Sequence, residues 1–338
     1  MTRTTPARPV AVEAVFPELA AYRGRTTRLH PRPGRPGCRD SHVGGPLLWP
    51  SDEPWPFCDE PWPFCDEPHQ SETEGYAPQE IRAARAAGVW PRSRPWREAG
   101  GPEPDEPTPF VGLAQFFARD VPGLAAGPGG ADLVQLFRCP HTHGPRLERR
   151  YLLKWRSAAL TERGGRFLAV PPEPPLVRWE HELPEPCVLH PEEVDSYPWA
   201  EDDTLPPALI ARIDAWDDAQ IEEGGRHAPS YQGALSIPPG WRVGGFPSWA
   251  STGPMDITCE CCGEPMRLLL TAGGDEMDAD SHSWMPWEDR DPSLQGMDSI
   301  RRGQSVAMPT RLRFGRDRDL HVFICRADQG HPPRWVLS

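Results

Sequence analysis

Two cysteines in the C-terminal part of the chain have the spacing of a metal-binding knuckle. They occur in the run Cys259-Glu-Cys-Cys262-Gly263, which can point two sulfurs at one ion. Cys325 and His331, further along the chain, can complete a Cys₃His set, a common closed tetrahedral zinc site. The alternative is that Cys325 is a small buried apolar residue. Cys261 is the spare thiol of this set, and it either faces away or substitutes for a ligand.

A second Cys/His set lies in the N-terminal half. Cys65 is followed by His69 in Cys-Asp-Glu-Pro-His, and Cys139 is followed by His143 in Cys-Pro-His-Thr-His. Together the four side chains predict a Cys₂His₂ zinc site, with His141 as a substitute ligand. The alternative is that these are polar loop histidines without a ligand role.

A perfect tandem repeat precedes this second set. The heptad Asp52-Glu-Pro-Trp-Pro-Phe-Cys58 recurs as Asp59-Glu-Pro-Trp-Pro-Phe-Cys65. Such identity indicates a slippage insertion in a loop that tolerates extra length. Only Cys65 has a histidine four residues later, because Cys58 has Trp62 at that distance. We therefore expect Cys65 to be the ligand and Cys58 to be redundant.

The histidines cluster with cysteines rather than with a nucleophile. The sequence contains no Gly-x-Ser-x-Gly elbow, phosphate-binding glycine loop or His-Glu-x-x-His pair. Four protein ligands leave zinc no open position for water, so both sites are expected to be structural rather than catalytic. The competing hypothesis is a metal-dependent hydrolase with an open zinc site and Glu260 or Glu264 as base. It would need a missing ligand, and His331 is the weakest assignment because its loop shows no turn that fixes it.

The elements that must position these ligands are mostly strands. Branched and aromatic runs predict strands at 26–30, 109–117, 132–139, 151–155 and 267–271. Helices are expected at 16–22, at 79–87 with Gly88 closing it, and from Pro207 to Gly224 with Thr204 as a cap. The 45 prolines and 31 glycines predict many short elements joined by loops.

The second half of the sequence repeats motifs of the first half in the same order. Val43-Gly-Gly-Pro-Leu-Leu-Trp49 matches Val243-Gly-Gly-Phe-Pro-Ser-Trp249, and the strand ending at Cys139 matches the one ending at Cys325. The alternative is that two Gly-Gly turns arose by chance in a glycine-rich chain. The fold class we predict is β-rich α+β, an internal duplication of two antiparallel-sheet halves with long Pro/Gly-rich loops. The expected boundaries are 1–25 for a loose N-terminal segment, 26–172 and 236–338 for the halves, and 173–235 for an acidic linker with one amphipathic helix.

Charge and hydropathy limit the partners. The net charge of the 338 residues is −13, and the stretch from Glu173 to Glu223 is strongly acidic. This balance disfavours nucleic acid and anionic membranes and suits a basic protein partner. No apolar run approaches the roughly 20 residues that span a bilayer, and the first residues lack the apolar core of a signal peptide. We therefore expect a cytoplasmic protein whose cysteines are thiols or metal ligands.

The order of three motifs resembles the YwqG-like family of bacterial proteins of unknown function. They are Ser41-His-Val-Gly-Gly-Pro, then Phe110-Val-Gly-Leu-Ala-Gln-Phe with Asp120-Val-Pro122, then Cys259-x-x-Cys262-Gly263-x-x-Met266. The resemblance runs from about Thr26 to Trp335. It implies a duplicated β-rich α+β fold and brings no established activity.

The last eighty or so residues are also similar, more faintly, to the C-terminal domain of programmed-cell-death-two-like proteins, which are chaperones for a ribosomal protein. The expectation from sequence is a non-enzymatic, zinc-stabilised cytosolic binding protein, chaperone-like or toxin-neutralising.

Overall fold

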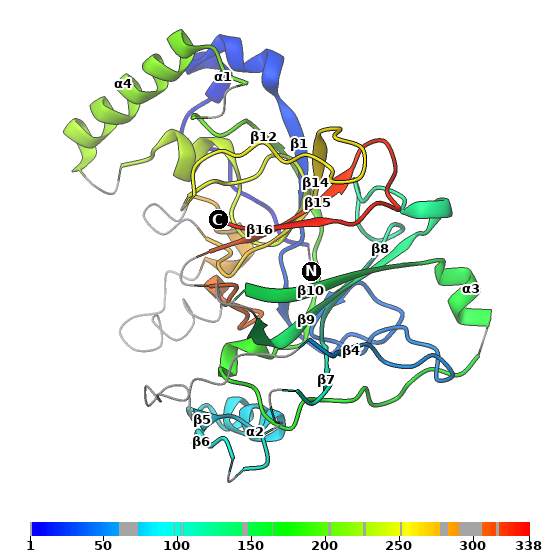
Figure 1. Ribbon diagram of the computed structural model, residues 1–338. Coiled ribbons are helices and arrows are strands. Elements are labelled where there is room, and N and C mark those ends of the chain that lie inside the picture. Colours follow the sequence, from blue (N-terminus) through cyan, green and yellow to red (C-terminus); the bar gives the residue numbers. More distant parts are fainter. Residues whose placement is uncertain are drawn as a thin grey trace.

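The computed structural model describes most of the chain in one α+β arrangement (Figure 1). It describes residues 2–60, 74–97, 99–101, 103, 105–143, 148–163, 165–201, 204–225, 228–250, 252–277, 283–290, 306–315 and 318–338. The helices are α1 (Val12–Val15), η1 (Pro17–Tyr22), α2 (Pro78–Ala87), η3 (Pro128–Gly130), α3 (Ala158–Arg163), η4 (Glu180–Glu182), α4 (Pro207–Gly224), η6 (Tyr231–Ser236) and η7 (Trp287–Asp289).

The strands fall into two six-stranded antiparallel sheets and two small ribbons. Sheet I has the order β2-β11-β3-β8-β9-β10, and its strands are β2 (Arg32–Pro33), β11 (Cys187–Val188), β3 (His42–Val43), β8 (Val111–Phe117), β9 (Leu133–His143) and β10 (Glu148–Arg156). Sheet II has the order β12-β1-β13-β14-β15-β16, and its strands are β12 (Glu192–Ser196), β1 (Gly24–Arg28), β13 (Arg242–Gly244), β14 (Met266–Ala272), β15 (Leu320–Cys325) and β16 (Arg334–Leu337). The ribbons pair β4 (Phe57–Cys58) with β7 (Thr108–Pro109), and β5 (Glu74–Gly75) with β6 (Arg94–Pro95).

Each sheet contains a four-strand antiparallel meander with the same register. The first strand of each meander, β3 or β13, is short and ends at a Gly-Gly pair. Val43 of β3 pairs with Ala114 of β8, and Val243 of β13 pairs with Leu270 of β14. The next pairing, of β8 with β9 or of β14 with β15, has a β-bulge at the same position in both sheets. The bulge lies between Gly112 and Ala114 in sheet I and between Leu268 and Leu270 in sheet II. β8-β9-β10 and β14-β15-β16 are thus matched strand by strand.

The glycine pairs are required by the backbone at these turns. Gly44 and Gly244 have φ values of 71° and 67°, in the left-handed region that side chains other than glycine rarely adopt. A Cβ on Gly44 would also lie 2.6 Å from the carbonyl oxygen of Glu185. The glycines therefore serve a turn, as the sequence indicates, rather than a reaction.

The two sheets share one apolar core. A single cluster of buried residues includes Leu113 and Phe116 of sheet I together with Val243 and Val322 of sheet II. Rings also meet across the sheets, with Phe116 and Trp241 centroids 6.1 Å apart. The meanders are consequently packed against each other and not separated by a linker.

Strands cross the boundaries expected from sequence. β1 lies at the start of the range 26–172 predicted as the first half, yet it pairs in sheet II between β12 and β13. The range 173–235, expected as a linker, contributes β11 to sheet I and β12 to sheet II. The chain between the meanders is therefore part of both sheets.

The predicted helices are present, but the N-cap predicted for one of them is wrong. α2 ends at Gly88, which has φ 66° as expected for a left-handed C-cap. α4 spans Pro207 to Gly224, but its N-cap is Pro206 and no side-chain cap is present, so the predicted cap at Thr204 is wrong. Figure 1 shows α4 projecting beside α1 at the upper left. Among the described residues, no helix is both long and apolar enough to cross a bilayer.

Candidate metal centres

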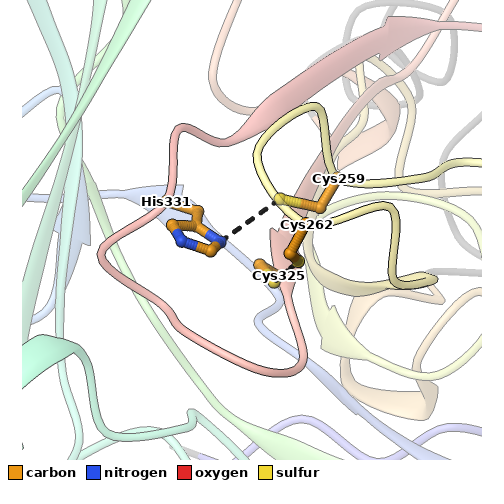
Figure 2. Close-up of side chains that lie close together, drawn as sticks. All are labelled: Cys259, Cys262, Cys325 and His331. Atoms are coloured by element: carbon orange, nitrogen blue, oxygen red, sulfur yellow. Dashed lines mark hydrogen bonds between the residues drawn. The ribbon is translucent and has the colours of Figure 1, made fainter.

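A four-ligand cluster stands at the end of β15. The Sγ atoms of Cys262 and Cys325 are 3.5 Å apart, and Cys259 Sγ lies 3.4 Å from Nδ1 of His331. All four ligand atoms lie within 4.8 Å of one another. Figure 2 shows the three cysteines and the imidazole converging from two loops. The four residues predicted as the C-terminal set are therefore brought together.

The cysteine knuckle is held by its own backbone. The amide of Gly263 donates to the carbonyl of Cys259 at 2.8 Å, and the amide of Cys259 donates to the carbonyl of Glu264 at 2.9 Å. Gly263 has φ 75°, which explains the glycine after the second cysteine. β14 begins two residues after Glu264, so the knuckle is anchored directly to sheet II. Cys261 is exposed and stands outside the cluster.

The loop that carries His331 contains a turn that the sequence analysis did not recognise. Asp328 accepts the amide of His331 with its carbonyl at 3.1 Å, and its Oδ1 accepts the amide of Gly330 at 2.8 Å. The amide of Asp328 in turn donates to Cys325 Sγ at 3.5 Å. The expectation that nothing fixes His331 is therefore wrong, because an aspartate turn ties this loop to the neighbouring ligand.

These contacts favour thiolate at Cys325. The donated N–H of Asp328 lowers the pKa of Cys325 to about 6. The hydrogen bond with Cys325 raises the pKa of His331. The site thus combines a thiol of lowered pKa with an imidazole of raised pKa. Metal ligation requires deprotonated ligand atoms, so a divalent ion would compete with protons here.

A second cluster lies under the β4-β7 ribbon. His143 Nε2 is 3.2 Å from Cys139 Sγ and 3.6 Å from Cys58 Sγ. All three side chains are buried, and their ligand atoms lie within 4.8 Å of one another. Cys139 and His143 are four residues apart on β9, and Cys58 ends β4. The hydrogen bond with Cys139 lowers the pKa of Cys58 to about 5, and the same bond raises the pKa of Cys139.

The expectation that Cys58 is redundant is corrected here. Cys58 occupies the place beside Cys139 and His143 that the sequence analysis gave to Cys65. Cys65 and His69 lie outside the described residues, so their predicted ligand roles stay predictions. Because the two heptads have the same sequence, the heptads themselves do not distinguish their cysteines. The spacing to His69 favoured Cys65 and gave no indication of the place of Cys58.

His141 does not serve as the substitute ligand within the described structure. Its Nε2 lies 3.2 Å from the hydroxyl of Thr108, and its ring packs at 5.8 Å from that of Trp96. Its backbone amide donates to Cys139 Sγ at 3.4 Å. His141 therefore supports a ligand through its main chain while its side chain packs elsewhere.

The distances fit zinc. Zn–S bonds of about 2.3 Å in a tetrahedron place two sulfurs roughly 3.8 Å apart, and shorter Zn–N bonds bring nitrogen and sulfur slightly closer. The 3.5 Å sulfur pair and the nitrogen–sulfur distances of 3.2 to 3.6 Å lie near those values. A thiolate-rich set also selects zinc over hard cations such as magnesium or calcium. Both clusters could therefore hold a metal ion, and their chemistry suits zinc.

The carboxylates considered as hydrolytic bases are both exposed. Glu260 forms an exposed ion pair with Arg334. Glu264 is exposed, and its carbonyl belongs to the knuckle. The remaining described cysteines, Cys38 and Cys187, stand outside both clusters, and the thiol of Cys187 donates to the carbonyl of Pro309.

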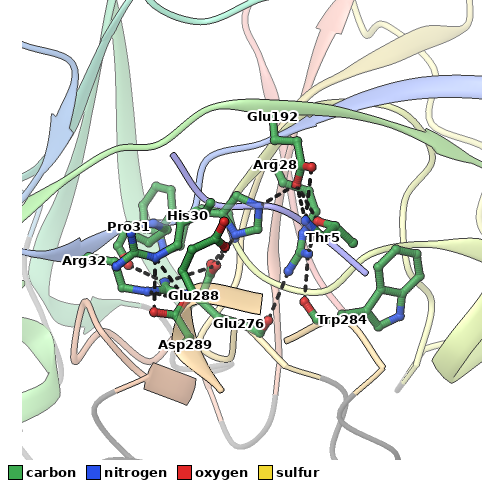
Figure 3. Close-up of polar contacts among 12 residues, drawn as sticks. Thr5, Arg28, His30, Pro31, Arg32, Glu192, Glu276, Trp284, Glu288 and Asp289 are labelled. Atoms are coloured by element: carbon green, nitrogen blue, oxygen red, sulfur yellow. Dashed lines mark hydrogen bonds and ion pairs between the residues drawn. The ribbon is translucent and has the colours of Figure 1, made fainter. Parts of the chain in front are cut away.

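A buried charged network, which sequence analysis missed, joins the N-terminal segment to sheet II (Figure 3). Arg28 donates to the hydroxyl of Thr5 at 2.8 Å and to the carbonyl of Trp284 at 2.9 Å. His30 lies 3.1 Å from Glu192, and burial lowers its pKa to about 3. We interpret this network as structural. Its only sequence signal was a basic and histidine-bearing strand at 26–30.

Arg32 and the carboxylates of Glu276 and Asp289 extend the same network. Arg32 pairs with Asp289 at 2.5 Å and lies 3.7 Å from Glu276. Glu276 also accepts the amide of Trp241 at 3.0 Å, and burial raises its pKa. The network thereby ties the segments around residues 276 and 289 to β2, which contains Arg32, and to Arg28 at the end of β1.

Comparison of the chain with models of known protein families finds no match, and no curated protein sequence matches it. The resemblance to the YwqG-like family accordingly stays a prediction that rests on its motifs.

Proposed function

We propose that this chain is a non-enzymatic binding protein whose two meanders are each fastened by a zinc ion. The observation that carries the proposal is the convergence of Cys259, Cys262, Cys325 and His331 within 4.8 Å. These ligands come from the loop before β14 and from the end of β15 and the loop after it. An ion held by them would fasten two neighbouring strands at one end of sheet II.

We further propose that the meanders are copies of one ancestral unit. Both clusters use the cysteine near the end of the second long strand, Cys139 or Cys325, and both draw ligands from the loop after the Gly-Gly pair. A buried polar contact also recurs: Gln135 donates to the carbonyl of Leu48 at 3.1 Å, and His321 Nε2 lies 2.8 Å from the carbonyl of Ser248. Each of these carbonyls directly precedes the matched tryptophan, Trp49 or Trp249.

Four protein ligands support a structural role at the cluster in sheet II, because they fill a tetrahedral zinc. The alternative function, a metal-dependent hydrolase, needs an open coordination position. The cluster of Cys58, Cys139 and His143 supplies three ligands from the described residues, and all three are buried. We favour the structural role because Glu260 and Glu264, the bases named for hydrolysis, stand at the other cluster and are exposed.

The surface we propose for a basic partner is an acidic stripe on α4. Asp214, Asp218 and Glu222 are exposed and recur at four-residue intervals, so they share one helix face. Only Leu209 and Ile213 of this helix are buried, and α4 projects from the body (Figure 1). A face of one charge sign steers an oppositely charged protein toward it.

Two measurements test this proposal. Removing zinc with a chelator should lower the melting temperature, and restoring zinc should recover it; an unchanged transition would contradict the structural role. For the partner, basic proteins captured from cytosol should be lost at high salt and lost with the triple substitution Asp214→Asn, Asp218→Asn and Glu222→Gln. A matched control neutralises the exposed loop carboxylates Glu103, Asp105 and Glu106. Equal loss with both triple variants would contradict a role for the stripe.

The cytosolic setting and the chaperone-like or toxin-neutralising role are part of the same proposal. Thiolate ligands are stable in a reducing compartment, which supports the first. The second rests on the YwqG-like and programmed-cell-death-two-like resemblances and on the acidic stripe.

A further inference from the structure

The groove beside the Gly-Gly turn of sheet I is covered by a proline-rich segment of the chain itself. Gly45, Val111 and Gly112 line this groove, and the run Pro171-Pro-Glu-Pro174 lies along it, leaving a cavity of about 100 Å³. A backbone hydrogen bond holds the chain just before this segment: the amide of Leu168 donates to the carbonyl of Trp49 at 2.9 Å. Pro174 is buried there.

Sheet II has a groove at the matching position, and it is wider. Gly245, Arg267 and Leu268 hold the places of Gly45, Val111 and Gly112 in the shared register, and all three line a cavity of about 430 Å³. Its other walls include Phe246 and Met255, and Met255 is exposed. The residues lining this cavity, within the described part of the chain, include no crossing segment equivalent to 171–174.

Arginine side chains line both grooves, but only the one in sheet I is paired with a carboxylate. In sheet I, Arg82 lines the groove and forms an ion pair with Glu173 of the covering segment. In sheet II, Arg267 and Arg326 line the groove, and neither has an ion-pair partner among the described residues. Asp256, which is exposed, lies in the same lining and offsets one of the two positive charges. The open groove therefore offers an unpaired arginine to an incoming carboxylate.

The matched tryptophans, Trp49 and Trp249, also differ in whether the indole N–H has a hydrogen-bond acceptor. Trp49 Nε1 donates to the carbonyl of Glu53 at 3.0 Å. Its counterpart Trp249 lines the open groove, is buried, and has an Nε1 without an acceptor in the described structure. A buried donor without a partner destabilises the folded state. The wall of the sheet II groove thus lacks a backbone contact that its counterpart has.

We infer that the sheet II groove binds an extended, proline-rich segment of a partner protein that carries a carboxylate, in the manner of Pro171–Pro174 in sheet I. Proline fits this task because it holds the extended conformation before binding and loses little entropy. The carboxylate would pair with Arg267 or Arg326 as Glu173 pairs with Arg82. This surface lies apart from the acidic stripe of α4 and does not depend on it.

The test uses the full zinc-loaded chain and a fluorescein-labelled peptide with the sequence of residues 168–176, Leu-Ala-Val-Pro-Pro-Glu-Pro-Pro-Leu. Fluorescence anisotropy should show saturable binding. Met255→Asp, and separately Arg267→Glu with Arg326→Glu, should weaken it at least tenfold. The matched control Leu160→Asp, at another exposed apolar residue, should leave it unchanged. A peptide with glutamine for its glutamate should bind more weakly and with less dependence on salt.

Zinc content and melting temperature of each variant show that the fold is intact. Absence of binding to the folded wild-type chain would overturn the inference. Binding that Met255→Asp and the double arginine substitution leave unchanged would also overturn it, because the peptide would then be displacing the covering segment of sheet I. Self-association of the chain that Met255→Asp abolishes, without peptide binding, would assign the groove to a second copy instead.

Discussion

Replacing Cys58 by serine tests the cluster of Cys58, Cys139 and His143 most sharply. Cys58 ends β4, is buried, and lies 3.6 Å from His143. A serine hydroxyl at this place is a poor zinc ligand, and it leaves the ion with Cys139 and His143 from the described residues. We expect the chain to lose one zinc equivalent and to become less stable.

The size of the effect follows from the energy of structural zinc. Such a site contributes on the order of 10 kcal/mol of folding free energy. Losing the ion removes this whole contribution, on the order of 10 kcal/mol. At roughly 2–4 °C for each kcal/mol, the melting temperature should fall by about 20–40 °C.

The assay is zinc per chain by elemental mass spectrometry together with thermal unfolding followed by circular dichroism. Cys38→Ser is the matched control, because Cys38 is a half-buried thiol outside both clusters. Full zinc content and an unchanged melting temperature in Cys58→Ser would refute the placement of this ligand. Such a result would return the role to Cys65.

Deleting one copy of the tandem heptad is a companion experiment to Cys58→Ser. Deleting Asp52–Cys58 or deleting Asp59–Cys65 produces the same chain, because the two copies are identical. The product keeps one cysteine, which has the upstream sequence of Cys58 and the downstream sequence of Cys65, with His69 four residues on. It should retain zinc and stability, in contrast to Cys58→Ser.

The remaining predictions concern sheet II and pH. Cys262→Ser should remove one zinc equivalent, whereas Cys261→Ser, at the adjacent exposed thiol outside the cluster, should retain it; equal zinc loss in both would contradict the assignment. Gly263→Ala should cost about 1 kcal/mol because φ is 75° at this position, and it should weaken zinc retention against a competing chelator; unchanged retention would contradict the role of the turn. Burial raises the pKa of Asp319 to about 6 from its ordinary 3.8, so its ionisation costs the folded state roughly 3 kcal/mol, and stability should fall as pH rises from about 4 to about 6. Asp319→Asn should therefore raise the melting temperature more at pH 7.5 than at pH 5, and an equal gain at both would contradict this.

Local patterns in the sequence were sufficient for the strands and for one cluster. The runs at 109–117 and 132–139 occur as β8 and β9, because they are rich in branched and aromatic residues, which favour strands. The Cys-x-x-Cys-Gly knuckle is local too, since the glycine conformation and two backbone bonds suffice to shape it. These features depend on few residues that are near one another in the chain.

Long-range pairing explains what the sequence did not reveal. β1 pairs in sheet II although it begins at Gly24, because its partners β12 and β13 lie far along the chain. The position of Cys58 beside Cys139 depends on the β4-β7 ribbon, whose two strands are about fifty residues apart in the sequence. The network of Arg28, His30 and Glu276 joins segments that share no pattern.

Native mass spectrometry of the full chain tests the central claim most directly, because it counts ions bound to each intact molecule. We expect two zinc ions on the folded wild-type chain, with one lost in Cys58→Ser and the other lost in Cys262→Ser. A folded wild-type chain that carries no zinc after purification in zinc-containing buffer would contradict the proposal that zinc fastens the two meanders.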